Sequence, residues 1–255
     1  MNKIISICNQ KGGVGKTTTV INLATYLALK NHKTLLVDID PQSNTTNGIG
    51  INSREIRKSI YDFLISSDKN LQEVIINTQV KNLFLIPSNI QLSGAEIELI
   101  NLSDREFYLK RGLEKIKDDF EYIFIDCPPS LSLLTINALT ACDSVIIPIQ
   151  CEYYALEGLT QLLDTIKQLK DNLNPRLTIE GMLLTMADFR TNLTKQVIKE
   201  VREFFKKEVY KTIIPRCIRL SEAPSFGKPI ALFSKRSQGA KSYLNLTNEF
   251  LKRNK

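Results

Sequence analysis

Short runs of consecutive apolar residues recur along the chain and alternate with longer segments of helical periodicity. Six of these runs predict buried strands, at residues 4–8, 34–38, 82–87, 122–126, 144–148 and 178–185. Several runs are apolar at every position instead of every second one, which is typical of parallel strands covered on both faces. The pattern therefore predicts a largely parallel sheet.

The segments between the runs carry apolar residues three and four positions apart. They predict helices over residues 17–30, 156–173 and 192–209, while the more polar residues 43–80 are interpreted as a small helical excursion. Strands that alternate with helices indicate a doubly wound α/β fold, with a mostly parallel sheet flanked by helices. Because the chain has no internal repeat and no low-complexity linker, residues 1–255 are expected to form a single domain.

The composition is that of an ordinary globular protein and narrows the function classes. Hydrophobic residues make up 43% and charged residues 24% of the chain, which excludes extensive disorder and coiled coils. The sequence has no run of 18 apolar residues and no N-terminal signal core, so we expect a cytoplasmic protein. Its five cysteines lack Cys-x-x-Cys spacing and its one histidine, His32, stands in a polar stretch, which disfavours metal clusters and His-based triads.

The positive charge is concentrated near the C-terminus. Residues 215–255 contain nine basic and two acidic residues, so this stretch alone accounts for the net charge of +7. A localised basic surface is expected of a protein that binds a polyanion, either nucleic acid or an anionic membrane. A solvated basic face that aids solubility would produce the same pattern.

One glycine-rich segment indicates a specific chemistry. Residues 11–18 follow a predicted strand and open a predicted helix, as a phosphate-binding loop does. Lys16 is placed to reach the β- and γ-phosphates of a nucleotide, and the Thr17 hydroxyl to coordinate Mg²⁺. Gln10 stands where the common pattern has glycine, and a second lysine, Lys11, lies inside the loop. The residues expected to cradle the phosphates with them are Gly12, Gly13, Val14, Gly15 and Thr18.

Carboxylates follow two further predicted strands. Asp38 and Asp40 end one strand, and strand alternation sends both to the same side. We expect Asp40 to position a water molecule in line with the γ-phosphate and Asp38 to support Mg²⁺ through its water shell. Asp126 ends another apolar strand, as a Walker B aspartate does, and completes an expected metal site with Thr17 and Asp40. Since ligands of open α/β sheets bind at this edge, the segments together predict a site for the phosphates of a nucleotide and for Mg²⁺.

With these segments established, the chain resembles the deviant Walker A ATPases of the P-loop NTPase fold, and among them the ParA/Soj partition ATPases. The resemblance spans nearly the whole chain. The matching stretches are residues 9–18, 38–42, 126–130, 148–158, 214–216 and 219–225, of which the last three are specific to the Soj branch. Cys217, where asparagine is usual, and Ala187, where a bulkier residue is common, depart from the pattern.

The resemblance implies roles for individual residues of the nucleotide site. Lys11 resembles the lysine that reaches across an ATP-dependent sandwich dimer to the partner's phosphates. The catalytic residues implied in this way are Lys11, Lys16 and Asp40. Three residues lie where the family holds the adenine base: Met186, Pro215 and Arg216.

The resemblance also implies a DNA-binding surface. Arg190 and Arg219 resemble arginines that grip duplex DNA without reading its sequence. The basic residues expected to extend this surface are Lys228, Lys235, Arg236 and Lys241. Dimerisation would bring two copies of the surface together and strengthen non-specific binding to the DNA backbone. A ParB-type centromere-binding protein would stimulate slow hydrolysis, in a nucleoid-associated protein without membrane attachment. Because the phosphate loop starts at residue 11, no N-terminal helix-turn-helix domain is expected.

Four other classes of protein are alternatives to a partition ATPase. A MinD-like positioning ATPase would need an amphipathic membrane anchor, whereas residues 243–255 have few apolar positions and are interpreted as a helix packed on the domain. A nitrogenase-reductase-like carrier would need paired cluster cysteines, and a tyrosine-kinase-like regulator would need more C-terminal tyrosines than Tyr243. A scaffold that binds ATP without turnover is disfavoured by the intact Lys16, Asp40 and Asp126.

Overall fold

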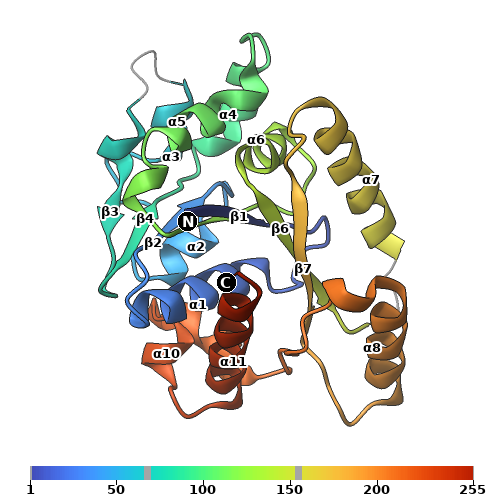
Figure 1. The fold of residues 1–255 in the computed structure, drawn as a ribbon. Helices are drawn as coiled ribbons and strands as arrows, with labels where there is room; N and C mark the ends of the chain where they lie inside the picture. The colour runs from blue at the N-terminus through green and yellow to red at the C-terminus, as the bar shows by residue number, and fades with distance from the viewer. Residues whose placement is uncertain (1, 66–69, 153–156, 255) are drawn as a thin grey trace.

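A seven-stranded sheet runs through the centre of the molecule (Figure 1). The computed structural model describes residues 2–65, 70–152 and 157–254. The strands are β1 (Lys3–Ile7), β2 (Thr34–Asp38), β3 (Ile76–Asn77), β4 (Leu83–Ile86), β5 (Tyr122–Asp126), β6 (Ser144–Gln150) and β7 (Thr178–Thr185). Their order is β3-β4-β2-β5-β1-β6-β7, and every neighbouring pair is parallel except β3 with β4. The predicted doubly wound, mostly parallel sheet is confirmed.

All six predicted strands are present, within one or two residues of the expected bounds. Their continuous apolar runs follow from burial on both faces, since every residue of β2 and β5 is buried. The two-residue strand β3 was not predicted, because it is too short for a periodic pattern and lies at the edge of the sheet. It belongs to the segment 43–80, whose described residues also include short helical pieces at 44–48, 60–65 and 71–74, as expected, with turns between the first two.

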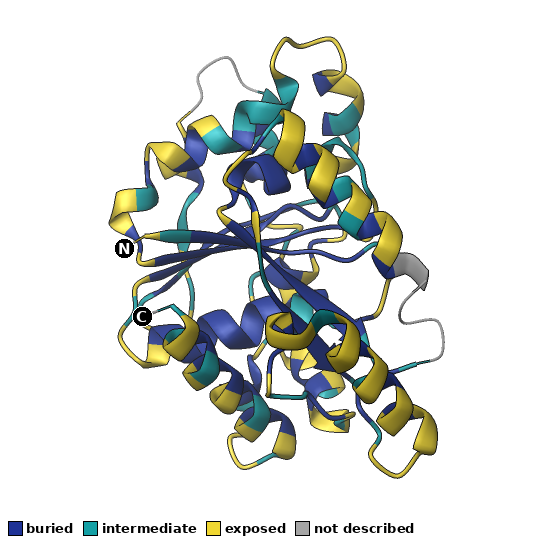
Figure 2. Cartoon of the chain, turned by 45° about the vertical axis from the view of Figure 1, so that its right-hand side comes forward, coloured by how far each residue is buried: buried dark blue, intermediate teal, exposed yellow. Residues whose placement is uncertain are grey.

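Helices cover both faces of the sheet (Figures 1 and 2). On one face lie α1 (Lys16–Leu29), α2 (Asn44–Gly48), α9 (Ile218–Glu222), α10 (Ile230–Phe233) and α11 (Gln238–Arg253). On the other lie α3 (Ile60–Ile65), α4 (Leu92–Leu99), α5 (Tyr108–Glu114), α6 (Leu133–Ala141), α7 (Glu157–Asn172) and α8 (Asn192–Phe205). The short 3₁₀ turns are η1 (Leu71–Val74), η2 (Arg105–Phe107), η3 (Lys117–Asp119), η5 (Lys206–Glu208) and η6 (Ala223–Phe226). Figure 2 shows the buried sheet between the two layers.

Helix α1 positions the loop that precedes it. Eleven of its 14 residues are buried, because it lies between the sheet and α11. The Thr19 and Tyr243 hydroxyls are hydrogen-bonded at 3.1 Å, which ties α1 to α11. Asn22 accepts a hydrogen bond from the N–H of Ile230 at 2.8 Å and so ties α1 to α10. These polar contacts within an apolar layer hold the start of α1 in one place.

Two predicted helices have different ends in the structure. The helix predicted over 192–209 ends at Phe205, where Lys206 (φ 48°) leaves the right-handed helical conformation and η5 follows. The helix predicted over 156–173 is described as Glu157–Asn172, and residue 156 lies outside the described residues.

The C-terminal helix packs as the sequence suggests. Leu246 and Phe250 of α11 are fully buried against α1 and the sheet. Within the described part of the chain, we find no helix that combines the length and the apolar character needed to cross a bilayer.

Candidate nucleotide-binding site

The loop between β1 and α1 surrounds an open space at the carboxyl edge of the sheet. Gly13 (φ 74°) and Gly15 (φ 90°) have left-handed backbone conformations that glycine adopts without strain. A Cβ built at Gly12 or Gly13 would meet no heavy atom within 4 Å, so the backbone is bare on this side. The first N–H groups of α1, which lack partners within the helix, adjoin the loop. The loop therefore has the shape and the donors of a phosphate cradle.

The two lysines of the loop occupy opposite environments. Lys16 is buried, and its ammonium donates a hydrogen bond to the Lys11 carbonyl at 3.1 Å. The side chain of Lys11 is 43% exposed, and its Nζ lies 3.6 Å from a carboxylate oxygen of Glu152. Lys16 is thus placed to act within its own subunit, whereas Lys11 is accessible to another molecule.

Asp126 ends β5 beside the start of α1. One carboxylate oxygen, Oδ2, accepts hydrogen bonds from the Thr17 and Thr45 hydroxyls, both at 2.7 Å. The other, Oδ1, is buried and finds no hydrogen-bond partner among the described residues. Burial and the nearby Asp40 carboxylate together raise the pKa of Asp126 to about 6, although the hydrogen bonds from the two threonines act to lower it. A bare carboxylate oxygen beside a threonine hydroxyl is a donor set that fits Mg²⁺.

The two carboxylates that follow β2 differ in their contacts. Asp38 pairs in register with Asp126, and its carboxylate accepts hydrogen bonds from the Thr46 N–H at 2.8 Å, the Thr46 hydroxyl at 2.7 Å and the Asp40 N–H at 3.2 Å. Burial and the charge of Asp126 raise the pKa of Asp38 to about 8. These contacts anchor the loop 40–46 to Asp38, and the support of the metal's water shell by Asp38 stays a prediction.

Asp40 remains a candidate for chemistry. It is 6% exposed, and its Oδ1 accepts a hydrogen bond from the Gln42 N–H at 2.9 Å. Its charge contributes to the raised pKa of Asp126, so the two carboxylates lie in one electrostatic environment. The structure therefore brings Thr17, Asp40 and Asp126 together, as the sequence predicts.

A cavity of about 320 Å³ adjoins the loop. The residues placed by resemblance around the base, Met186, Pro215 and Arg216, all line it. The residues that the sequence analysis did not assign to this cavity are Thr185, Ile214, Cys217, Ile218, Leu220, Ser221 and Tyr243, beside Gly15 and Thr18 of the loop and α1. Most of the lining is apolar, with a tyrosine and hydroxyls at intervals, which suits a planar heterocycle.

The cavity is held against the phosphate cradle by two backbone features. The Thr185 hydroxyl donates a hydrogen bond to the Val14 carbonyl at 2.8 Å, which joins the end of β7 to the loop. Met186 then takes a left-handed conformation (φ 51°), unusual for a residue with a side chain, and Ala187 bridges to Pro215. A base and its phosphates can therefore be bound side by side.

Glu152 connects the two parts of the site. It lies 3.6 Å from the Lys11 ammonium and 3.8 Å from the Arg216 guanidinium, and it accepts a hydrogen bond from the Gln150 side chain at 2.5 Å. From the sequence, Glu152 has no assigned role beyond its place in the matching stretch 148–158. Its position between a loop lysine and a base-pocket arginine comes from the packing of β6 beside β1.

The predicted DNA-binding residues are all exposed. The Arg190 side chain is 88% exposed and forms a two-point contact with Asp188, which lowers the pKa of Asp188 to about 2 through hydrogen bonds and charge. Arg219 lies on α9 near the base cavity and pairs with Glu222 at 2.8 Å. The other predicted residues, Lys228, Lys235, Arg236 and Lys241, follow along α10 and the start of α11.

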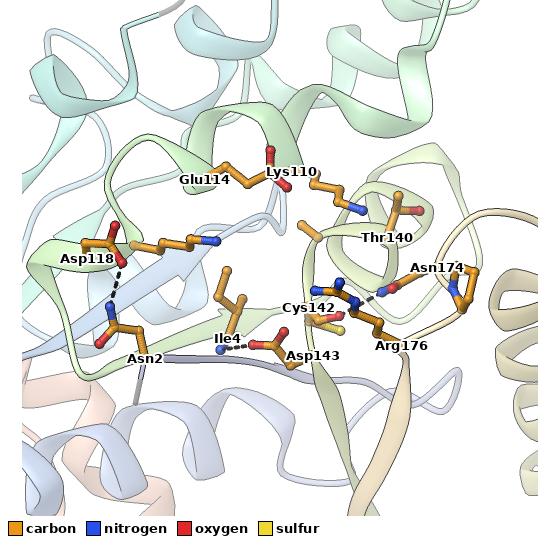
Figure 3. Close-up of a pocket in the computed structure, with 13 residues that line it drawn as sticks. Asn2, Ile4, Lys110, Glu114, Asp118, Thr140, Cys142, Asp143, Asn174 and Arg176 are labelled. Carbon is orange, nitrogen blue, oxygen red and sulfur yellow. Dashed lines mark hydrogen bonds between the residues drawn. The ribbon is translucent and has the colours of Figure 1, made fainter.

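A second cavity, of about 620 Å³, lies at the opposite edge of the sheet (Figure 3). It contains the beginning of β1, where the Ile4 N–H donates to the Asp143 carboxylate at 2.8 Å, and the Asn2 amide, which donates to Asp118 at 2.8 Å. Lys110 and Arg176 enter it from two sides (Figure 3). No residue of the predicted nucleotide site lines this cavity, so it is separate from the phosphate loop.

Comparisons with known proteins show similarity over nearly the whole chain. A family model described as an AAA domain matches residues 2–179. The sporulation initiation inhibitor protein Soj of Bacillus subtilis is 59% identical over 249 residues, which cover 98% of each chain. The chromosome partitioning protein ParA of Myxococcus xanthus is 54% identical over 253 residues, 99% of this chain and 89% of the relative. The structure of cobyrinic acid a,c-diamide synthase from Mycobacterium smegmatis with a bound ATP analogue and magnesium is similar at a TM-score of 0.87 and 35% identity, over 99% and 95% of the two chains.

Proposed function

The chain belongs to the ParA/Soj family of partition ATPases, and on this premise we propose that it is an ATPase that partitions chromosomal or plasmid DNA. The observation that carries the proposal is the convergence of Lys16, Thr17 and Asp126 on one open loop, in a chain this similar to Soj. We take residues 1–255 as a single domain that contains both the nucleotide site and the DNA-binding surface.

ATP is the nucleotide that this site accommodates. The glycine loop and Lys16 bind the phosphates, and the cavity lined by Met186, Pro215 and Arg216 binds the base. Thr17 and Asp126 hold Mg²⁺, which neutralises phosphate charge and orients the reacting group when bound. The similarity to a structure that contains an ATP analogue and magnesium supports both ligands.

Asp40 carries the hydrolytic step. Its carboxylate positions a water molecule for attack on the γ-phosphorus and accepts a proton from it, while the bond from that phosphorus to the bridging β-phosphate oxygen breaks and ADP leaves. Lys16 stabilises the negative charge that develops on the transferred phosphoryl group. We propose that turnover is slow until a ParB-type partner stimulates it.

Lys11 couples nucleotide binding to dimerisation. Among the described residues, its exposed ammonium pairs with one exposed carboxylate, Glu152, and such a pair contributes at most about 1 kcal/mol. Lys11 is therefore free to leave Glu152 and to neutralise phosphate charge in a second subunit. Two subunits joined in this way bring Arg190 and Arg219 of each to one duplex, where backbone contacts give affinity without sequence specificity.

The decisive experiment measures binding to a scrambled duplex DNA with ATP and Mg²⁺, with ADP, and without nucleotide, over a series of salt concentrations. We expect the tightest and most salt-sensitive binding with ATP. An Asp40→Ala variant should remain on DNA because it cannot turn over, whereas Lys11→Ala should lose the ATP-dependent gain. Lys81→Ala removes an exposed lysine and serves as the control. Equal binding in all three nucleotide states would contradict the proposal, and binding to anionic vesicles without binding to DNA would replace it with a membrane-associated function.

A further inference from the structure

The cavity of about 620 Å³ at the amino edge of the sheet is not used by the proposed function (Figure 3). Its walls come from four parts of the chain: the beginning of β1, residues 110–118 of α5 and η3, residues 140–143 at the end of α6, and residues 174–176 before β7. We call it the amino-edge cavity. Sites for small molecules measure about 300–1,000 Å³, so this cavity is large enough for an organic ligand.

Hydrogen bonds fix the walls of the amino-edge cavity. The side-chain amide of Asn174, which is 5% exposed, donates to the carbonyls of Leu139 at 2.9 Å and Cys142 at 2.7 Å. The Ile4 N–H donates to the Asp143 carboxylate at 2.8 Å, and the Asp143 N–H donates to the Ile4 carbonyl at 2.8 Å. These contacts join the loop before β7 and the beginning of β1 to the end of α6. Because the walls are already ordered, a ligand loses little free energy in arranging them.

Three cationic side chains of the lining have no anionic partner. They are Lys110 of α5, Lys117 of η3 and Arg176 of the loop before β7. In the part of the chain that the structure describes, no carboxylate lies within 4 Å of their charged groups. Figure 3 shows that Lys110 and Arg176 reach into the cavity from two sides. An anion placed between them would accept charge-assisted hydrogen bonds, and Arg176 can donate two in parallel.

The carboxylates of the same lining are engaged elsewhere or face solvent. Asp143 accepts the backbone N–H at the beginning of β1, and Asp118 accepts a hydrogen bond from the Asn2 amide at 2.8 Å. Glu114 is exposed. It stands four residues after Lys110 on α5, a spacing at which opposite charges pair, but no ion pair joins the two. The cationic groups are therefore left for a ligand.

The buried part of the lining is mostly apolar. Ile4, Ala141 and Cys142 are buried and line the cavity. Thr140, which is 1% exposed, lines it as well, and its hydroxyl has no hydrogen-bond partner among the described residues. Apolar surface favours contact with a carbon skeleton over contact with a hydrated inorganic ion. The lining thus combines cations for acidic groups with apolar surface for an organic body.

We propose that the amino-edge cavity binds a small organic anion, a molecule of metabolite size whose carboxylate or phosphate groups are held by Lys110, Lys117 and Arg176. Its carbon skeleton lies against Ile4 and Ala141. The cavity shares no lining residue with the base cavity or the phosphate loop, so the anion and the nucleotide are bound at the same time. The inference goes beyond the proposed function and does not depend on it.

The test measures binding of two probes to the full chain, with ADP and Mg²⁺ at saturating concentration so that the phosphate loop is occupied. The probes are tricarballylate, which offers three carboxylates, and glycerol 3-phosphate, which offers one phosphate group. The cavity variant is K110Q/K117Q/R176Q. The control variant is R54Q/K81Q/K170Q, which loses the same charges at exposed positions outside the cavity.

We expect calorimetric titration to give a dissociation constant below about 1 mM for at least one probe. The cavity variant should bind that probe at least about tenfold more weakly, because each hydrogen bond between charged groups contributes that much or more. The control variant should bind it as the wild type does. The probe that binds more tightly shows whether the cavity recognises carboxylates or phosphate.

Hydrogen–deuterium exchange locates the bound probe. We expect slower exchange in residues 108–118 and 174–180, with residues 11–18 unchanged. Equal affinity of the wild type and the cavity variant would overturn the proposal. Protection confined to the phosphate loop or to residues 215–255 would do the same, as would the absence of binding by both probes up to about 10 mM. Thermal melting and unchanged ADP affinity verify that the variants are folded.

Discussion

The two edges of the sheet hold charge in opposite ways. At the carboxyl edge, Lys16, Asp40 and Asp126 are buried and their charges act on one another, and one Asp126 oxygen has no partner among the described residues. Toward the amino edge, Lys206, Lys207, Lys211 and Lys252 are exposed and lie around the ends of α8 and α11. Buried charges interact strongly and need defined partners, whereas the interactions between exposed charges are weak and are screened by salt. The first arrangement suits chemistry on one small ligand, and the second suits a long polyanion.

The largest expected effect is on ATP turnover, which should depend on a lysine at the carboxyl edge and not on one at the amino edge. Lys16→Ala removes a buried ammonium aimed at the phosphates and should lower ATP turnover by about 10²–10³-fold, as loss of one preorganised charge does. Lys206→Ala removes an exposed ammonium at the end of α8 and should leave turnover unchanged. Phosphate release measures both, with thermal melting as the check on folding. Turnover of Lys16→Ala within threefold of the wild type would remove Lys16 from the mechanism.

Alanine substitutions at two glycines, Gly181 and Gly12, should differ in their effect on the free energy of unfolding. A Cβ at Gly181 would lie 2.6 Å from the Tyr210 ring and 3.0 Å from the Glu208 carbonyl, so Gly181→Ala should cost about 2 kcal/mol of unfolding free energy by overpacking. A Cβ at Gly12 enters open space, so Gly12→Ala should keep its stability and weaken nucleotide binding by intruding on the cradle. Urea titration and nucleotide titration of both variants measure the difference. Equal free energies of unfolding for the two variants would contradict the expected difference.

The free energy of unfolding is expected to depend on pH through Glu180, near the beginning of β7. Burial tends to raise the pKa of Glu180, but hydrogen bonds from Lys3, Asn254 and Ser144 outweigh it, and the pKa is lowered. A carboxyl group with a lowered pKa stabilises the fold above its unfolded-state value and loses that contribution as the pH falls through the folded value. Glu180→Gln should therefore be less stable than the wild type by about 1 kcal/mol at pH 7. Denaturation curves from pH 7 to pH 3 should show the difference shrinking below pH 4.5; a constant difference would argue against ionic stabilisation.

The smallest effect concerns the exposed pair between Lys11 and Glu152. Glu152→Gln removes the carboxylate that holds Lys11 in its own subunit, and pairs this exposed contribute about 0.2–1 kcal/mol. ATP-dependent dimerisation should tighten by no more than about fivefold at low salt, and the gain should vanish at high salt. Sedimentation at two salt concentrations measures it. Weaker dimerisation in the variant would show that Glu152 contributes to the dimer and does not compete with it.

Much of the fold and of the nucleotide site could be predicted because the relevant residues are close in sequence. Gly13, Gly15, Lys16 and Thr17 form one continuous loop, whose glycines and strand-to-helix context predict its conformation. Asp126 ends an uninterrupted apolar strand, and a parallel sheet brings such strand ends to one edge. The contacts of Asp38 with Thr46 were not predictable in this way, because they depend on how the next loop folds back.

Local patterns in the chain thus decided which segments are strands, where the phosphate loop lies and which carboxylates face it. Those features depend on backbone conformation and on burial, both of which are written in neighbouring residues. Only the tertiary structure decided the position of Glu152 between Lys11 and Arg216, the lining of the base cavity, and the meeting of basic residues from the ends of α8 and α11. The basic residues at 252 and 253 illustrate the reason, because they join Lys206 and Lys211 instead of Arg219 once α11 packs along α1 and ends beside β7. Contacts between distant segments follow from how helices pack on the sheet, which no local pattern specifies.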